Sequence, residues 1–167
     1  GQRSAQEFEN HKSFAVLKSD GSVVTWGDSD TGGDSSAVSD LLTANVIQIF
    51  SNERAFAALK NDGSVVTWGD PDSGGDSSAV SDLLNADVSK IFSTSDSFAA
   101  IKEDGSVVNW GGGWISGIND SWIVNETASE INHSKTISYG HIRDQLLSEV
   151  RHIFSNENAF AALKEDG

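Results

Sequence analysis

The sequence predicts an all-β protein assembled from several small, similar sheets. Three observations point to this: a repeat of 42 residues, an Asp-Gly dipeptide between two apolar runs in each repeat, and an abundance of β-branched and aromatic residues in those runs. Repetition at this period is typical of folds in which each unit buries its apolar surface only against its neighbours.

The first two copies of the repeat have equal length and are identical at 30 of 42 positions. The segment before them has only Phe8 as a large apolar residue, so we expect no clear strand there. We therefore divide the chain into an N-terminal segment (1–13), repeat 1 (14–55), repeat 2 (56–97), repeat 3 (98–159, with an insertion at about 112–141) and the start of repeat 4 (160–167).

Each repeat begins with a predicted hairpin. Its turn is the Asp-Gly dipeptide, which supplies the positive φ angles that tight hairpins need. The flanking runs are apolar at consecutive positions, as in Phe56–Leu59, which indicates strands buried on both faces and hence sheets enclosed by neighbouring sheets. The turns are Asp20-Gly21, Asp62-Gly63 and Asp104-Gly105.

A third strand is predicted at residues 46–50, 88–92 and 150–154. Between hairpin and third strand lies a loop rich in Gly and Asp, followed by Val38, Leu41 and Leu42 at the spacing of one helical face. We therefore expect one or two helical turns there, with a short edge strand as the alternative.

Small sheets covered on both faces and repeated about every forty residues are typical of β-propellers. The string VIQIFSNERAFAALKNDGSVVTWGDPDSGG, from Val46 and again in similar form from Val88, resembles the repeat of the regulator of chromosome condensation (RCC1) family. The resemblance implies RCC1-like propeller blades, which usually close a ring of about seven. It does not carry over GTPase exchange, because the loops here are acidic and nearly identical between copies.

About 3 to 3.5 blades are predicted, so the array is incomplete or open. The strand at 160–164 is expected to lack its hairpin partner and to present unpaired backbone groups. Three interpretations remain: a fragment of a longer repeat protein, association with other copies that completes a blade, or a short array capped by the N-terminal segment. Phe160 and Leu163 are candidates for an interaction surface.

Composition excludes several function classes. The formal net charge is −14, which disfavours nucleic acid and anionic membranes as partners, and no apolar run is long enough to span a membrane. Cysteine is absent, so disulfides, thiolate metal sites and cysteine nucleophiles are excluded. No nucleophile elbow or phosphate loop is present, and we predict no enzymatic activity.

The acidic loop is a candidate calcium site. Its pattern D-x-D-x-G-G-D alternates carboxylates with glycine as calcium loops do, but the bidentate Glu at position twelve is missing. The alternative is a polar loop in which aspartates cap turns. The candidate ligands are Asp28, Asp30, Asp34, Asp70, Asp72 and Asp76.

The tryptophans at equivalent repeat positions, Trp26, Trp68 and Trp110, are expected to pack between blades, although a carbohydrate-stacking ladder is the alternative. Trp114 and Trp122 lie in the insertion and are freer to form a binding surface. The insertion also contains three N-x-S/T triplets, which would be glycosylated on a eukaryotic secretory route: Asn119, Asn125 and Asn132.

The sequence thus favours a non-enzymatic structural or interaction scaffold, extracellular or on a cell surface, that pairs with other protein chains, copies of itself among them. A calcium- or carbohydrate-binding module is the alternative. No cofactor is expected other than calcium.

Overall fold

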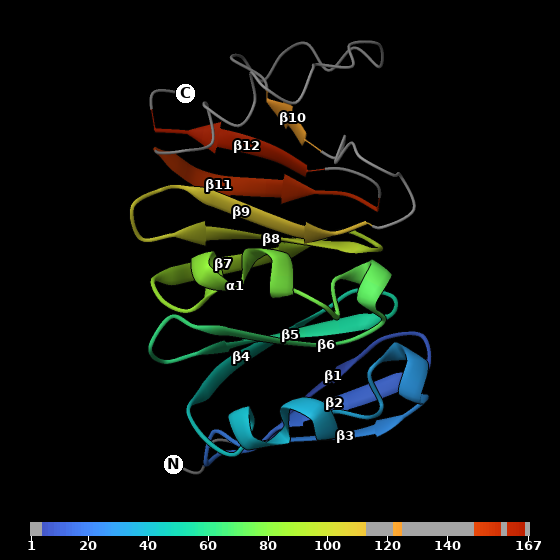
Figure 1. Cartoon of the computed structure of the whole chain (residues 1–167). Helices are drawn as coiled ribbons and strands as arrows, with labels where there is room; N and C mark the ends of the chain where they lie inside the picture. The colour runs from blue at the N-terminus through green and yellow to red at the C-terminus, as the bar shows by residue number, and fades with distance from the viewer. Residues whose placement is uncertain (1–4, 113–121, 125–148, 158–159, 166–167) are drawn as a thin grey trace.

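The computed structural model describes residues 5–112, 122–124, 149–157 and 160–165. In this part of the chain, four three-stranded sheets follow one another in a single stack, which we call blades 1 to 4 (Figure 1). Blade 1 contains β1 (Gln6–Glu9), β2 (Ser13–Leu17) and β3 (Val23–Gly27); blade 2 contains β4 (Val46–Ser51), β5 (Ala55–Lys60) and β6 (Val65–Gly69); blade 3 contains β7 (Val88–Ser93), β8 (Ser97–Lys102) and β9 (Val107–Gly111); blade 4 contains β10 (Trp122–Val124), β11 (Val150–Ser155) and β12 (Phe160–Lys164).

Blades 1 to 3 are antiparallel meanders whose strands follow chain order. Each sheet therefore opens with the strand that the repeat count assigns to the end of the preceding repeat. The first strands of blades 2 to 4 carry an irregularity at the same position, next to Val46, Val88 and Val150. The expected all-β fold, an open array of small sheets, is confirmed.

The central strands are buried on both faces, as predicted. In β5, Phe56 and Ala58 pack into the core shared with blade 1, while Ala57 and Leu59 pack into the core shared with blade 3. Side chains alternate between faces along a strand, so an uninterrupted apolar run serves both neighbours. The alanines let the sheets approach closely, and the phenylalanine fills the remaining space.

The Asp-Gly turns differ in one respect from the prediction. Only the glycines have positive φ, for example 80° at Gly21, whereas Asp20 does not. Gly21 N–H donates to Lys18 O at 3.0 Å, and Lys18 N–H donates to Ser22 O at 2.9 Å. This is the pattern of a type I turn followed by a left-handed residue, so the aspartate is free to accept hydrogen bonds with its side chain.

The same turns join consecutive blades. The carbonyl of Gly63 accepts a hydrogen bond from Val88 N at 2.9 Å, and Gly21 and Gly105 make the equivalent bond to Val46 and Val150. Asp87, just before β7, has a φ of 64°. A Cβ on Gly63 would lie 2.6 Å from Asp87 N, so this turn and the next blade leave no room for a side chain.

The predicted helical turns are present between blades. They are short: η1 (Ser29–Thr31), η2 (Ser36–Leu41), η3 (Pro71–Ser73), η4 (Ser78–Val80) and α1 (Ser81–Leu84). Leu42 and Leu84, at their ends, are buried between the sheets. Within the described residues, no helix is long and apolar enough to cross a membrane.

Two expectations about strands were wrong. Residues 1–13 were expected to contain no clear strand, but β1 pairs with β2 from Gln6 to Glu9 because backbone pairing does not require an apolar strand. The strand at 160–164 was expected to lack its hairpin partner and to present unpaired backbone groups; the second part is wrong over three residues, where β10 pairs with it in parallel, with Trp122 opposite Phe160.

We predict that Gly63→Ala destabilises the protein by more than about 2 kcal/mol, because a side chain at positive φ is strained and its Cβ meets the backbone of Asp87. Asp87→Gly is the matched control on the other side of the joint. It removes a left-handed non-glycine residue and should change the free energy of unfolding by less than about 1 kcal/mol. Denaturant unfolding measures the free energy of unfolding of both variants. An equal loss of stability in the two would contradict the steric requirement for glycine at position 63.

Candidate functional site: the joints between blades

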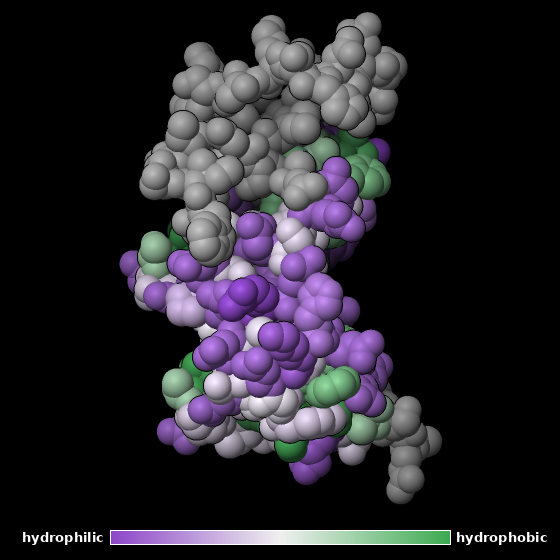
Figure 2. Space-filling view, turned by 90° about the vertical axis from the view of Figure 1, so that its right-hand side faces the viewer, coloured by the Kyte–Doolittle hydropathy of each residue, from purple (hydrophilic) through white to green (hydrophobic). Residues whose placement is uncertain are grey.

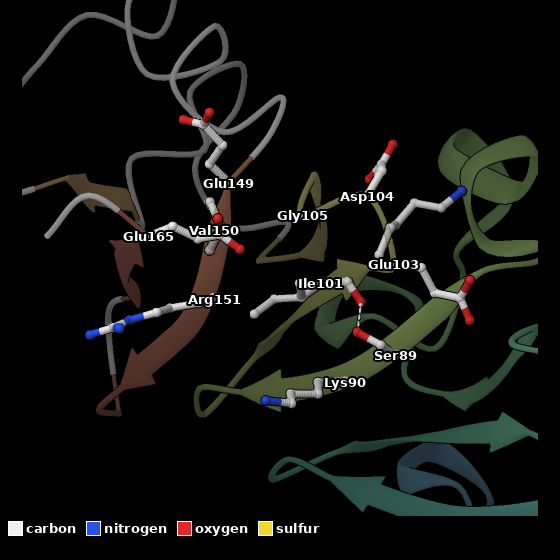
Figure 3. A pocket seen from close by; sticks show the side chains of 11 residues that line it. Ser89, Lys90, Ile101, Glu103, Asp104, Gly105, Glu149, Val150, Arg151 and Glu165 are labelled. Carbon is white, nitrogen blue, oxygen red and sulfur yellow. Dashed lines mark hydrogen bonds between the residues drawn. The ribbon is translucent and has the colours of Figure 1, made fainter.

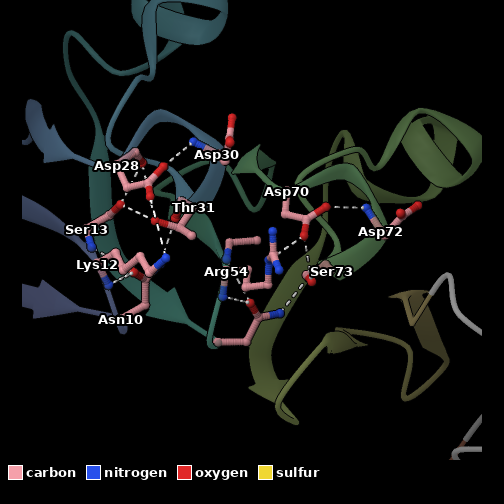
Figure 4. Close-up of polar contacts among 12 residues, drawn as sticks. Asn10, Lys12, Ser13, Asp28, Asp30, Thr31, Arg54, Asp70, Asp72 and Ser73 are labelled. Atoms are coloured by element: carbon pink, nitrogen blue, oxygen red, sulfur yellow. Dashed lines mark hydrogen bonds and ion pairs between the residues drawn. The ribbon is translucent and has the colours of Figure 1, made fainter.

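The acidic loop of each repeat is organised by its own aspartates. Asp28 Oδ1 accepts a hydrogen bond from Asp30 N at 2.9 Å (Figure 4). Asp34 Oδ1 accepts one from Ser36 N at 2.9 Å. Asp70 and Asp76 make the equivalent bonds to Asp72 N and Ser78 N. Asp28 and Asp70 are the N-caps of η1 and η3 and satisfy a backbone donor that has no partner within the helix. Asp34 and Asp76 lie one residue before the N-caps of η2 and η4 and each accept from the backbone two residues later.

The carboxylates are not gathered around one point. Among the described residues, no group of three or more His, Asp or Glu side chains is placed to hold a metal ion. Asp70 instead forms an ion pair with Arg54, whose Nε lies 2.6 Å from Oδ2, and Asp28 lies 3.9 Å from Lys12 Nζ (Figure 4). Calcium binding by these loops stays a prediction.

Five aspartates have a lowered pKa. The hydroxyl of the serine two positions later is the main cause, and the backbone N–H of the same serine is the second. Both groups stabilise the charged carboxylate. The aspartates are Asp20, Asp34, Asp62, Asp76 and Asp104.

The glycines of the acidic loop lie directly under the next blade. Trp68 Nε1 donates to Gly32 O at 3.0 Å across the joint between blades 1 and 2, and Trp110 Nε1 donates to Gly74 O at 3.1 Å across the next joint. Phe56 stacks on Trp68 with ring centroids 5.4 Å apart, and a Cβ on Gly32 would lie 2.6 Å from the Phe56 ring. The expected packing role is thus filled by Trp68 and Trp110, each 4% exposed, whereas Trp26 is 44% exposed.

An asparagine, buried at Asn52 and half-buried at Asn10, links the central strand of each of the first two blades to the acidic loop, and the sequence analysis missed it. Asn52 Nδ2 donates to Ser73 O at 2.6 Å, and its Oδ1 accepts from Ala55 N at 2.8 Å. Asn10 repeats this arrangement with Thr31 O and Ser13 N. The signal was available, because both asparagines stand three residues before the alanine or serine that opens the central strand.

A groove with a volume of about 410 Å³ lies between blades 3 and 4 (Figure 3). Glu103, Asp104, Glu149 and Glu165 surround it, with Lys90, Lys102 and Arg151 nearby. Ser89 Oγ donates to Ile101 O at 3.0 Å and is therefore engaged. The groove is open to solvent and mixed in charge, and no nucleophile with an adjacent base stands out in it.

The remaining site predictions fall at the C-terminal end. The main chain of Trp122 lies in β10, Phe160 is buried in the core between blades 3 and 4, and Leu163 is half-buried. Trp114 and the three asparagines of the N-x-S/T triplets lie outside the described residues. Glycosylation therefore stays a prediction.

Removing the indole donor at one joint should cost stability. We predict that Trp68→Phe keeps the aromatic stack but leaves the buried carbonyl of Gly32 without its partner, which lowers the free energy of unfolding by about 1–3 kcal/mol. Trp26→Phe is the matched control, with an expected change below about 0.5 kcal/mol because this side chain is exposed. Similar losses in both variants would show that the indole bond contributes nothing.

The aspartates with a lowered pKa should make stability depend on pH in acid. Their contribution is present above the unfolded-state pKa of 3.8 and is lost as the pH falls through the lower folded-state pKa. A variant with Asp20→Asn and Asp62→Asn should therefore lose less stability than the parent between about pH 5 and pH 2. Denaturant unfolding at several pH values measures this.

The matched control for acid unfolding combines Asp30→Asn with Asp72→Asn, because these two carboxylates accept no hydrogen bond from the described residues. The control should keep the pH dependence of the parent. An unchanged dependence in the Asp20 and Asp62 variant would contradict the role of the serine hydroxyls.

Comparison with solved structures identifies the fold. No family model and no curated protein matches the chain. The structure of Prp20p from Saccharomyces cerevisiae matches with a TM-score of 0.58 and 18% identity, over 96% of this chain and 42% of that one. Yeast RCC1 (Prp20) bound to Kap60 matches with a TM-score of 0.43 and 17% identity, over 64% of this chain and 29% of that one. The CRINKLY WD40 ectodomain of the Arabidopsis thaliana receptor kinase ACR4 matches with a TM-score of 0.43 and 19% identity, over 65% of this chain and 36% of that one. The chain thus spans less than half the length of these proteins, and its fold is that of RCC1-like β-propeller blades.

Proposed function

We propose that this chain is a non-enzymatic interaction scaffold made of RCC1-like blades, and that another protein chain completes blade 4 by strand pairing. The observation that carries the proposal is the outer side of β12. In blades 1 to 3, the outer side of the central strand pairs with an antiparallel strand over five residues. In blade 4, β10 pairs with that side in parallel and over three residues.

The position of β10 resembles that of the missing outer strand. In blades 1 to 3, a tryptophan of the outer strand stands opposite the phenylalanine of the central strand, as Trp68 stands opposite Phe56. Trp122 stands opposite Phe160 in the same way, although β10 runs in the other direction. We infer that β10 occupies a site suited to a strand of the SVVTWG type, and that a longer antiparallel strand would replace it.

Strand addition at a sheet edge suits a protein partner, because main-chain hydrogen bonds supply affinity and the alternate side chains supply specificity. Residues 64–69 show the sequence that such a strand would have, although in this chain their strand β6 already pairs with β5. The fold match to Prp20p is consistent with a scaffold role: the report of that structure describes its binding to Gsp1p and histones.

The proposal predicts that a peptide with the sequence of residues 63–69 binds to the chain. Fluorescence anisotropy of a labelled peptide measures the affinity. The control peptide carries proline in place of both valines and should not bind, because proline lacks the backbone donor.

Weakening β10 should strengthen this binding. In a variant with Ile123→Pro and Val124→Pro, at least one lost donor faces β12, so we expect at least a tenfold lower dissociation constant for the peptide. Absence of binding to both the parent and the variant would refute strand completion. Sedimentation velocity of the parent then shows whether copies of the chain serve as the partner.

A further inference from the structure

Three hairpin turns of the described chain place an exposed aspartate directly before a half-buried glycine with positive φ. The sequence contains four such pairs, of which three lie in the described residues: Asp20-Gly21, Asp62-Gly63 and Asp104-Gly105. The aspartates of the acidic loops precede serine, threonine or proline instead. Those loops lie on the side of the stack that Figure 2 shows, which is hydrophilic over its middle.

An aspartate followed by glycine can rearrange without an enzyme, because no Cβ shields the glycine nitrogen. At Asp62, the Gly63 nitrogen attacks the side-chain carbon Cγ. A bond between N and Cγ forms, and the amide proton and the hydroxyl of the protonated carboxyl leave together as water. Water then opens the resulting succinimide ring, and cleavage at the backbone carbonyl leaves isoaspartate. The reaction needs no co-reactant other than water, and no electrons are transferred.

The folded turn holds both reacting groups in forms that do not react. Ser64 Oγ donates to Asp62 Oδ1 at 2.6 Å, and Ser64 N donates to the same oxygen at 2.9 Å. These bonds stabilise the charged carboxylate and lower the pKa of Asp62, whereas ring closure requires the protonated acid. Gly63 N–H donates to Lys60 O at 3.0 Å, so the proton that the reaction must remove is engaged in the hairpin.

The same arrangement occurs at all three turns. In each, the serine that follows the Asp-Gly pair places its hydroxyl 2.6 Å and its backbone nitrogen 2.9 Å from the aspartate Oδ1. We propose that Asp20, Asp62 and Asp104 are sites of isoaspartate formation, and that the serine hydroxyl two residues later suppresses the reaction in the folded protein. This covalent modification is independent of the partner proposed for blade 4.

Isoaspartate at these turns opens the joints between blades, because it lengthens the main chain by one methylene group directly before the glycine. Gly63 O accepts from Val88 N at 2.9 Å, and a Cβ on Gly63 would already lie 2.6 Å from Asp87 N. The turn thus has no room for an extra atom, and displacement of the glycine removes the bond to the next blade. Asp104 and Gly105 line the groove that is open to solvent, so water reaches that turn (Figure 3).

The test removes one hydroxyl and keeps the other two turns as internal references. The folded parent and Ser64→Ala are incubated in buffer and digested, and isoaspartate at each turn is measured by chromatography and electron-transfer fragmentation of the peptides. We expect formation at Asp62 to be about fivefold faster in the variant, with Asp20 and Asp104 unchanged, because one of the two hydrogen bonds to the carboxylate is lost. Ser64→Thr keeps a hydroxyl and should keep the slow rate of the parent.

Ser22→Ala is the matched control and should move the faster reaction to Asp20. In denaturant, the parent and the variants should all react at one faster rate, since the hydrogen bonds of the turns are absent there. Equal rates at Asp62 in the folded parent and Ser64→Ala would overturn the proposal. So would a rise at all three turns together, which indicates a loosened fold, or no isoaspartate at these turns in the denatured chain.

The joint supplies a second measurement. Ion-exchange chromatography separates aged Ser64→Ala protein into molecules with isoaspartate and molecules with aspartate at position 62. The Val88 N–H should exchange with solvent at least about tenfold faster in the first form, because its acceptor has moved. Equal exchange of Val88 in the two forms, followed by NMR, would contradict the opening of the joint.

Discussion

The structure depends on one contact that recurs at the first two joints between blades: an indole N–H bonded to a glycine carbonyl, with a phenylalanine ring against the glycine. At the first joint these groups are Trp68, Gly32 and Phe56. Gly32 must be glycine because its φ is 101° and because a side chain would enter the ring. The Asp-rich sequence around it then follows as the caps that hold this glycine in place. Four of the six aspartates that suggested calcium therefore have a structural role as acceptors of backbone hydrogen bonds: Asp28, Asp34, Asp70 and Asp76.

This dependence on neighbours makes the protein a stack with two end faces. Each blade buries its central strand only because another sheet covers it, so stability comes from pairs of adjacent blades rather than from any blade alone. In such stacks the terminal units need a cap or a partner. The high negative charge keeps the sides of the stack solvated, but it does not remove exposed aromatic rings at an end face from water.

The sequence predicted the repeated hairpins, the doubly buried strands and the helical turns because each has a local signature: an Asp-Gly turn, an unbroken apolar run, or apolar residues at helical spacing. It failed where pairing comes from backbone geometry or distant contacts. The strand β1 is polar and is defined by its partner β2, and β10 pairs with a strand 36 or more residues away. Asn52 lies in the short connection between β4 and β5, and only the fold places Ser73 O beside it.

The two ends of the stack differ in the kind of bond they can form. At blade 4, a partner strand would lie in the plane of the sheet and gain main-chain hydrogen bonds, so its binding depends on length and direction more than on side chains. At blade 1, the exposed residues are the side chains Trp26 and Val24 on the sheet face, so a contact there would depend on apolar burial rather than on main-chain pairing.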